Sequence, residues 1–305
     1  MIRLRGIDHV CLLVDDVGEA RRRWSNEFGL IDRGEESDRA LLACEDEPYS
    51  LELVAGDPGH HHTAFELAPG CALTDAAASL EAAGVDYEAL EGSLFLSDPD
   101  GMRIELLPSR TRERWVAHAR PSTTVRPGAP RKLGHVNCLS AHLEDGARFY
   151  TEVLGMRVSD RLGAEGIWFH VSSDHHVMAL IGKGTSRFHH LAFDTVDIGQ
   201  MRDMLDRVAR HGRWLGWGPT RHGVGGNIAS YVRILEEGCF VELYCDMEQL
   251  QEGHVPRDWP DDRFSSNTWG PLPPRSYFRF DPVAVAWERE SLELLGRPLP
   301  PEEPA

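Results

Sequence analysis

The sequence predicts an α+β fold of two tandem modules, each built from two units in which a strand and a helix are followed by further strands. The prediction rests on an internal repeat, on hydrophobic periodicity, and on the turn-forming residues that interrupt it. Three pairs of segments repeat: GIDHVCLLVDDVGEARRRWSNEFGL (6–30) with LGHVNCLSAHLEDGARFYTEVLGM (133–156), HHTAFEL (61–67) with HHLAFDT (189–195), and, more loosely, DPDGMRIELL (98–107) with LEEGCFVELY (235–244). One folding unit therefore occurs twice in the chain.

Each copy of the repeat opens with a strand and a helix. In the first copy, residues 6–14 are rich in strand-forming types, and Asp16 and Glu19 have capping-box spacing at the start of the helix that follows. The apolar positions of this helix recur at helical spacing: Val17, Ala20, Trp24 and Phe28. Gly29 ends it, as glycine often ends a helix. The second copy has equivalent apolar stripes at Leu143, Ala147, Tyr150 and Leu154 and at Met201, Leu205 and Val208.

The other periodic segments complete the modules. In the first module, strands are expected at 40–45, 49–54, 61–67, 86–90, 93–97 and 102–107, with a second helix at 73–84. Residues 108–131 are rich in Pro, Arg, Ser and Thr and show no periodicity, which is typical of a linker. The expected division is a first module at 1–110, a linker at 111–130, a second module at 131–250 and a C-terminal tail at 251–305, with one helix near 282–295.

The composition excludes several classes of function. The 305 residues include 32 Lys and Arg against 49 Asp and Glu, a formal net charge of −17. Nucleic acid and anionic membrane surfaces would repel such a chain, and no apolar run approaches the ~20 residues that span a bilayer. The N-terminus lacks a signal-peptide pattern, so a cytoplasmic protein is expected. The six cysteines form no CxxC pair and are expected to be reduced core residues.

Three candidate metal ligands lie in the second module. His135 is in the first strand of the repeat, His190 is in HHLAF, and Glu242 is in the last strand. Two imidazoles and one carboxylate are the donor set of non-haem Fe(II) centres that keep positions open for substrate and O2. Each of these residue types, taken alone, is more often a packed or hydrogen-bonded residue than a ligand. Their joint occurrence on three strands of one module favours a metal site.

Three further residues can perform acid–base and hydrogen-bonding work beside such a metal. His176 lies in DHHVMAL, 14 residues before His190, and His222 and Tyr231 lie nine residues apart in RHGVGGNIASY. A histidine titrates near neutral pH, so it can take a proton from a substrate hydroxyl and return it. A tyrosine hydroxyl can donate a hydrogen bond to a substrate oxygen without being ionised itself.

These motifs and the two-module layout resemble the type I extradiol dioxygenases of the vicinal oxygen chelate superfamily over residues 6–250. The resemblance implies paired βαβββ units, with each module curling into an open barrel and the metal in the second module. Position by position, it implies the following site: His135, His190 and Glu242 as metal ligands, His176 as the acid–base residue, His222 and Tyr231 beside the substrate oxygens, and Trp168 and Asn137 in the pocket wall.

The resemblance implies extradiol cleavage of a catechol-type diol with O2 at a mononuclear Fe(II), in the catabolism of aromatic compounds. Mn(II) stays open because the same ligands bind it. The implied partners are a small aromatic diol, O2 and further copies of the chain, since family members are usually oligomers. One alternative is a metal-dependent isomerase or epimerase of the same superfamily, against which His176, His222 and Tyr231 argue. Another is a non-catalytic module that binds drugs or aromatic compounds.

Two features depart from the resemblance. The interval from Tyr231 to Glu242 is 11 residues, one more than expected, and a β-bulge would absorb the extra residue. The first module retains His9, His62 and Glu105 as repeat equivalents of the three ligands. A second metal site is therefore chemically possible there.

The first module is nevertheless expected to be non-catalytic. The residue 14 positions before His62 is Pro48. Phe95 and Leu94 lie 10 and 11 positions before Glu105. Neither the acid–base histidine nor the tyrosine of the second module is therefore expected to have a counterpart in the first.

The C-terminal tail carries charged and aromatic residues at Arg257, Arg263, Arg275, Trp259 and Trp269. In related enzymes a C-terminal segment folds over the pocket. The tail is accordingly expected either to limit access to the site or to serve as an oligomer contact.

Overall fold

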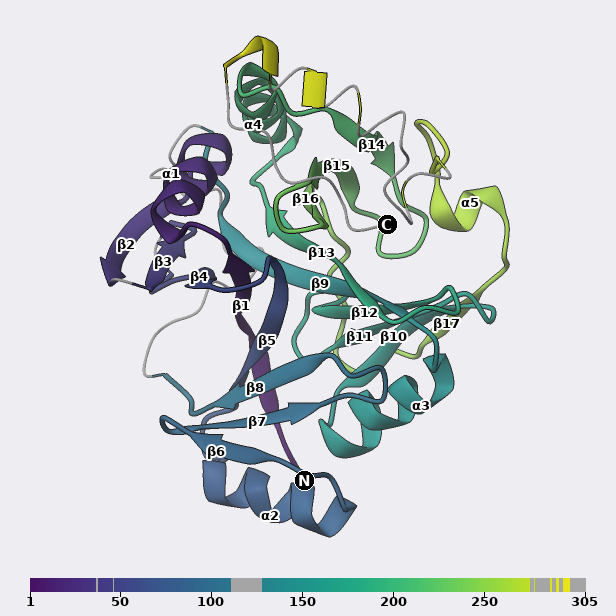
Figure 1. Cartoon of the computed structure of the whole chain (residues 1–305). Helices are drawn as coiled ribbons and strands as arrows, with labels where there is room; N and C mark the ends of the chain where they lie inside the picture. The colour runs from purple at the N-terminus through teal and green to yellow at the C-terminus, as the bar shows by residue number, and fades with distance from the viewer. Residues whose placement is uncertain are drawn as a thin grey trace.

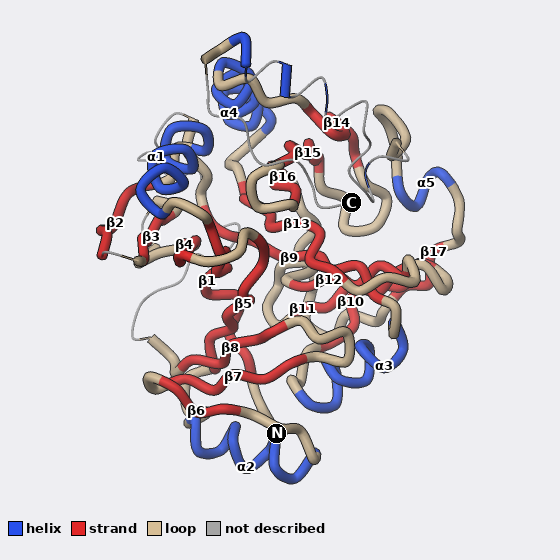
Figure 2. The backbone as a smooth tube through the Cα atoms, in the orientation of Figure 1, coloured by secondary structure: helices blue, strands red, loops and turns tan. Residues whose placement is uncertain are grey.

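The computed structural model describes residues 1–36, 38–45, 47–110 and 128–274, and further on residues 277, 286, 289, 290 and 293–296. The described strands form two large sheets, and the helices lie on their outer sides (Figures 1 and 2). Residues 111–127 of the expected linker at 111–130, Arg275 and most of the expected helix near 282–295 lie outside the described residues.

The first module is an eight-stranded sheet made of two βαβββ units. The first unit is β1 (Leu4–Val14), α1 (Val17–Phe28), β2 (Ile31–Glu36), β3 (Arg39–Ala43) and β4 (Leu51–Ala55). The second unit is β5 (Gly59–Leu67), α2 (Leu73–Ala83), β6 (Glu88–Leu90), β7 (Ser93–Ser97) and β8 (Arg103–Leu107). The strand order is β2-β3-β4-β1-β5-β8-β7-β6, so β1 and β5, which open the two units, pair antiparallel in the middle of the sheet.

The second module repeats this plan in a nine-stranded sheet of order β14-β15-β16-β13-β9-β12-β11-β10-β17. Its first unit is β9 (Lys132–Ser140), α3 (Leu143–Arg148) with the π-helical turn η1 (Phe149–Val153), β10 (Arg157–Leu162), β11 (Gly166–His170) and β12 (Met178–Gly182). Its second unit is β13 (Arg187–Asp194), α4 (Ile198–Arg210), β14 (Leu215–Arg221), β15 (Ile228–Ile234) and β16 (Cys239–Cys245). The tail adds β17 (Arg257–Trp259), parallel to β10, and α5 (Arg263–Ser266). The predicted α+β class of two modules with paired βαβββ units is confirmed.

The local sequence explains where α1 begins and ends. The Asp16 side chain accepts a hydrogen bond from the backbone N–H of Glu19 at 2.8 Å, which caps the start of the helix. The Glu19 carboxylate accepts from Arg23 rather than completing the expected capping box. Gly29 ends the helix in the left-handed conformation, with φ of 69°. The predicted apolar stripe is buried along its whole length: Val17, Ala20, Trp24 and Phe28.

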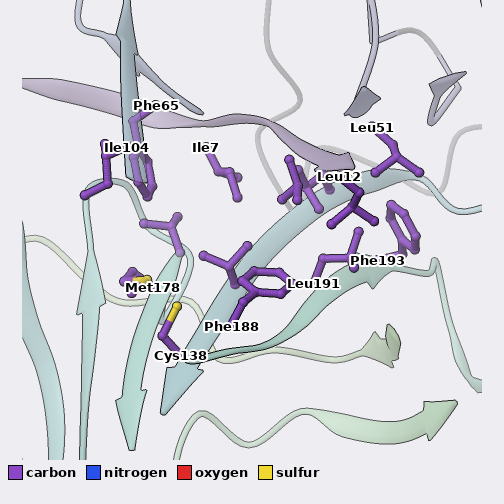
Figure 3. Packing of buried hydrophobic residues seen from close by; sticks show 14 of the residues in the cluster. Ile7, Leu12, Leu51, Phe65, Ile104, Cys138, Met178, Phe188, Leu191 and Phe193 are labelled. Atoms are coloured by element: carbon purple, nitrogen blue, oxygen red, sulfur yellow. The ribbon is translucent and has the colours of Figure 1, made fainter. Parts of the chain in front are cut away.

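One hydrophobic core joins the two modules. Figure 3 shows Ile7 and Leu12 of the first module facing Leu191 and Phe193 of the second, and all four belong to a single buried cluster. Each Å² of apolar surface buried in this way contributes about 25 cal/mol to folding. The six cysteines are all buried and free, as predicted. The first module therefore packs directly against β13, a strand that carries part of the candidate site.

Two local features differ from the sequence expectation. β2 is a strand that the pattern does not reveal, because an edge strand can carry the polar sequence IDRGEE. The β15–β16 hairpin contains no bulge; its pairing is continuous from Ile228 opposite Cys245 to Ile234 opposite Cys239. Residues 235–238 form the turn, and the strand pairing runs up to it on both sides. Among the described residues, no helix has the length and apolar character needed to cross a membrane.

Candidate metal centre and catalytic cavity

Sheet register brings the three candidate ligands together on one face of the second module. His135 on β9 lies opposite Ala192 of β13, and Ala192 lies opposite Glu242 of β16. His190 is two residues before Ala192, so it points to the same face, because side chains alternate along a strand. Three neighbouring strands thus present two imidazoles and one carboxylate to the same point.

The three side chains converge on a single carboxylate oxygen. Oε2 of Glu242 is 3.0 Å from Nε2 of His135 and 3.1 Å from Nε2 of His190, and all three residues are buried. Metal bonds of about 2.1 Å at right angles would separate neighbouring donors by about 3.0 Å. The donor set and its spacing therefore fit a divalent cation held by one face of its coordination shell.

The protonation of Glu242 also suits a ligand. Burial opposes ionisation, but electrostatic attraction and hydrogen bonds from His135 and His190 hold the pKa of the Glu242 carboxyl well below its usual range. The other oxygen, Oε1, accepts a hydrogen bond from Nδ2 of Asn227 at 2.8 Å. A carboxylate that stays ionised and is held from behind keeps Oε2 available for a cation.

His176 stands beside the triad, just before β12. Its ring centroid is 4.2 Å from that of His135, and its Nδ1 is 3.0 Å from Nδ1 of His175. Burial, and then the nearby positive charges of His135 and His175, lower the pKa of His176 well below its ordinary value. The imidazole is therefore neutral near neutral pH, and its Nε2 is left for a group in the cavity.

A chain of hydrogen bonds connects His176 to the tail. Nε2 of His175 lies 3.1 Å from Oδ2 of Asp160, and the same oxygen accepts from Nε1 of Trp259 at 2.7 Å. Arg257 also binds Asp160, at 2.8 Å. Burial opposes ionisation of Asp160, but these three partners hold its pKa well below its usual value. The ionised Asp160 thus orients the His175 ring, which in turn contacts His176.

His222 and Tyr231 form a pair on the opposite side of the triad. Nε2 of His222 is 2.7 Å from the Tyr231 hydroxyl, and Tyr231 lies directly opposite Glu242 in the β15–β16 pairing. Trp217 stacks on the Tyr231 ring at 5.1 Å between centroids. Burial raises the pKa of Tyr231 well above 10, so its hydroxyl stays protonated as a donor.

A cavity of about 270 Å³ opens onto these groups. The structure places all eight residues singled out from the sequence in its wall: His135, Asn137, Trp168, His176, His190, His222, Tyr231 and Glu242. Apolar side chains such as Ala179, Ile181 and Val224 complete it. The Oδ1 atom of Asn137 is buried without a hydrogen-bond partner among the described residues. A ligand that offers a hydrogen-bond donor would satisfy this atom.

Residues 132–233 match the model of the Glyoxalase/Bleomycin resistance protein/Dioxygenase superfamily. The match covers most of the second module. Metapyrocatechase 2 of Cupriavidus necator is 31% identical to the chain over 156 residues, which are 49% of this chain and 48% of that protein. Catechol-2,3-dioxygenase of Bacillus subtilis is 28% identical over 168 residues, 47% of this chain and 59% of the relative. The similarity thus spans about half the length of these curated relatives.

Solved structures share the fold of both modules. Homoprotocatechuate 2,3-dioxygenase from Brevibacterium fuscum, in complex with 3,4-dihydroxyphenylacetate, superposes with a TM-score of 0.78 at 22% identity, over 91% of this chain and 92% of that one. The Mn(II)-bound glyoxalase from Novosphingobium aromaticivorans gives a TM-score of 0.77 at 24% identity, over 90% and 94% of the two chains. At these identities the likeness shows the fold alone.

The cavity also contains residues that the sequence analysis did not identify. Asn227, Trp217 and Tyr277 line it. Asn227 lies in the RHGVGGNIASY motif, and its nearness to His222 and Tyr231 in sequence was the available signal. Tyr277 comes from the tail; its backbone oxygen accepts a hydrogen bond from Nε2 of His189 at 2.6 Å. The tail therefore contributes to the wall of the cavity.

Proposed function

We propose that this protein is an extradiol dioxygenase, which cleaves the ring of a catechol-type diol with O2 beside the two hydroxyls at a mononuclear Fe(II) centre. The observation that carries the proposal is the convergence of His135, His190 and Glu242 in one cavity, with His176 on one side and the His222–Tyr231 pair on the other. Catechol dioxygenases among its relatives support this reaction.

The triad would hold the metal and leave the cavity side of it free for substrate. When bound there, Fe(II) would supply Lewis-acid and redox chemistry, lowering the hydroxyl pKa values of a chelating diol and allowing electron transfer to O2. Mn(II) is the alternative ion, because the same donors bind it. Overall, a ring C–C bond beside the diol and the O–O bond break, and both oxygen atoms stay in the product.

His176 is proposed to move the proton. It is neutral at rest, so its Nε2 can accept a proton from a substrate hydroxyl. The protonated imidazole can then return that proton when the O–O bond breaks. The hydrogen bond from Nδ1 of His176 to His175, itself oriented by Asp160, keeps the ring in place during both transfers.

His222 and Tyr231 are proposed to position the substrate oxygens. Tyr231 keeps its proton, because its pKa is raised by burial and by the nearby Glu242, and so it can donate a hydrogen bond to an oxygen that carries negative charge. His222 is 2.7 Å from the same hydroxyl and fixes its direction. The apolar wall around them suits an aromatic ring and excludes water.

The proposal is tested by incubating Fe(II)-loaded protein in air with a panel of monocyclic catechols, bicyclic diols and hydroquinones. We expect yellow ring-cleavage products from at least one catechol-type diol, together with uptake of O2. A protein that binds these diols tightly without consuming O2 would instead be a binding module. Isomerisation of a substrate at a Mn(II)-loaded centre, again without O2 uptake, would favour an isomerase.

Tyr277 provides a separate prediction about substrate choice. The ring of this tail residue packs 4.8 Å from that of Tyr231 and 4.7 Å from that of Trp217. Replacing Tyr277 by Ala should enlarge the cavity and shift the ratio of kcat/KM for bicyclic against monocyclic diols by about 10-fold or more, since a single methylene in a pocket is worth about 10- to 200-fold. Steady-state kinetics on both substrates measure the ratio.

Trp269 is the control for this prediction. It lies in the same tail but is 46% exposed and does not line the cavity, so Trp269→Ala should leave the ratio unchanged. If Tyr277→Ala and Trp269→Ala both keep the wild-type ratio, the tail is a surface strap rather than a determinant of substrate choice.

A further inference from the structure

The first module carries a second convergence of metal-binding side chains. His9 on β1 lies opposite Ala64 of β5, and Ala64 lies opposite Glu105 of β8. His62 is two residues before Ala64 and shares its face. This is the same register that unites His135, His190 and Glu242, so the three positions are equivalent in space as well as in the repeat.

The donor atoms of this cluster are close together. Nε2 of His9 is 3.3 Å from Nε2 of His62 and 3.4 Å from Oε2 of Glu105, and His62 and Glu105 are 3.2 Å apart. A fourth donor comes from β4: Oε2 of Glu52 is 3.3 Å from Nε2 of His9. Strands β4, β1, β5 and β8 are successive neighbours in the sheet (Figure 1), so the four side chains come from one continuous surface.

Glu52 distinguishes this cluster from the candidate catalytic centre. It lies opposite Cys11 on β1. In the second module the counterpart of Cys11 is Asn137 on β9, and the residue opposite Asn137 is Ala179, whose side chain has no donor atom. The place that is open to the cavity in the second module is therefore filled by a carboxylate in the first. Arg39 binds the other oxygen, Oε1, at 2.5 Å, which leaves Oε2 directed at the two histidines.

The side chains are also oriented for ligation. Nδ1 of His9 lies 2.9 Å from Oδ1 of the fully buried Asp8, and the N–H that this contact requires leaves Nε2 as a lone-pair donor. Nδ1 of His62 is similarly engaged, 2.8 Å from Nδ1 of His61. Two imidazole Nε2 atoms and two carboxylates then face one another, and a cation would satisfy all four.

The groups around the cluster are not those of the catalytic cavity. Leu51 on β4 and Met178 on β12 occupy equivalent positions in the two sheets. Tyr49 lies two residues before Leu51, and His176 lies two residues before Met178. The structural counterpart of His176 is therefore Tyr49 and not Pro48, the residue expected from the sequence. The Tyr49 hydroxyl accepts a hydrogen bond from Arg110 at 3.0 Å. Phe95, opposite Glu105, replaces the tyrosine of the second module, as expected.

We propose that His9, Glu52, His62 and Glu105 form a second divalent-cation site, which stabilises the first module and takes no part in ring cleavage. Four-coordinate shells without an open position are typical of structural Zn²⁺ sites, and His nitrogen and Glu oxygen are both ligands of Zn²⁺. Bonds of about 2.0–2.1 Å at tetrahedral angles separate donors by about 3.3–3.4 Å, close to the four distances given above for His9 with its three partners and for His62 with Glu105. Zn²⁺ is accordingly the ion that this shell fits, and its loss should lower the stability of the module.

Metal stoichiometry in the full-length protein tests the proposal. Wild-type protein stripped with a chelator and reloaded with Zn²⁺, then desalted, should hold two equivalents per chain by elemental analysis. The double substitution Glu52→Gln/Glu105→Gln preserves the shape of both side chains but leaves only two neutral imidazoles, and this protein should hold one equivalent. Glu242→Gln should also hold one, because it loses the ion of the second module instead. The surface variant Glu88→Gln should keep both.

Thermal unfolding gives a second readout that does not depend on activity. In the Glu242→Gln background, Zn²⁺ should raise Tm, because a ligand that binds the folded state stabilises it. Adding both Glu52→Gln and Glu105→Gln should remove that rise. The proposal is overturned if wild-type protein holds one equivalent that Glu242→Gln abolishes, in which case the first cluster is a hydrogen-bonded network only. It is overturned equally if the double variant Glu52→Gln/Glu105→Gln leaves two equivalents bound.

Discussion

Replacing Glu242 by Gln should leave a folded protein that no longer holds Fe(II) in the second module and whose ring-cleavage rate falls by more than about 100-fold. Substitution of outer-shell partners of a metal site already costs about 10- to 100-fold, and Glu242 is the residue that both His135 and His190 contact. Removing its charge leaves two neutral imidazoles, a donor set too weak to keep Fe(II). Iron analysis and initial rates with a catechol measure the two losses.

The matched control is Glu105→Gln, the equivalent substitution in the first module. Its carboxylate lies in the other cluster, so ring cleavage should persist even if metal content there changes. A Glu242→Ala protein that is iron-replete and fully active would show that another carboxylate completes the centre.

His176→Phe should keep iron and substrate but slow turnover by about 10²- to 10⁴-fold, the usual contribution of a general acid–base group. Phenylalanine fills a similar volume but cannot accept or return a proton. The test separates binding from chemistry: anaerobic binding of the diol should match wild type, while single-turnover rates after O2 addition should fall. In the wild type, kcat/KM should stay constant as the pH falls to well below 6.5, because the lowered pKa of His176 keeps its imidazole neutral there.

The control for this variant is His142→Phe, because His142 is an exposed histidine outside the cavity wall. It should behave as wild type. Unchanged single-turnover rates in His176→Phe would remove this histidine from the mechanism and leave it as a packed neighbour of His175.

The fold was largely predictable because the repeat carries it. Two copies of one pattern limit the assignments, and the stripe of α1 is unambiguous at Val17, Trp24 and Phe28. Strand β2 was not predicted, because an edge strand exposed to solvent needs no apolar alternation. The bulge expected before Glu242 was wrong because chain length alone does not say whether a turn or a strand takes up an extra residue.

The candidate ligands could be predicted because strand register turns sequence spacing into spatial position. The residues that surround the candidate site and hydrogen-bond to its members could not be predicted from the sequence. Asp160, on β10, reaches His175 between β11 and β12, and Arg257 and Trp259 reach Asp160 from the tail. These contacts depend on how distant segments pack. Counting residues back from His62 pointed to Pro48, whereas sheet register identifies Tyr49, because the two modules differ by one residue between strands.

The most direct test of extradiol cleavage is the stoichiometry of O2 consumption by Fe(II)-loaded protein with the best catechol of the panel. We expect one O2 to be consumed for each catechol, and a ring-opened product heavier than the substrate by two oxygen atoms. Glu242→Gln should abolish both. Conversion of the diol without uptake of O2, or a product that gains one oxygen atom or none, would contradict the assignment of this cavity as an extradiol centre.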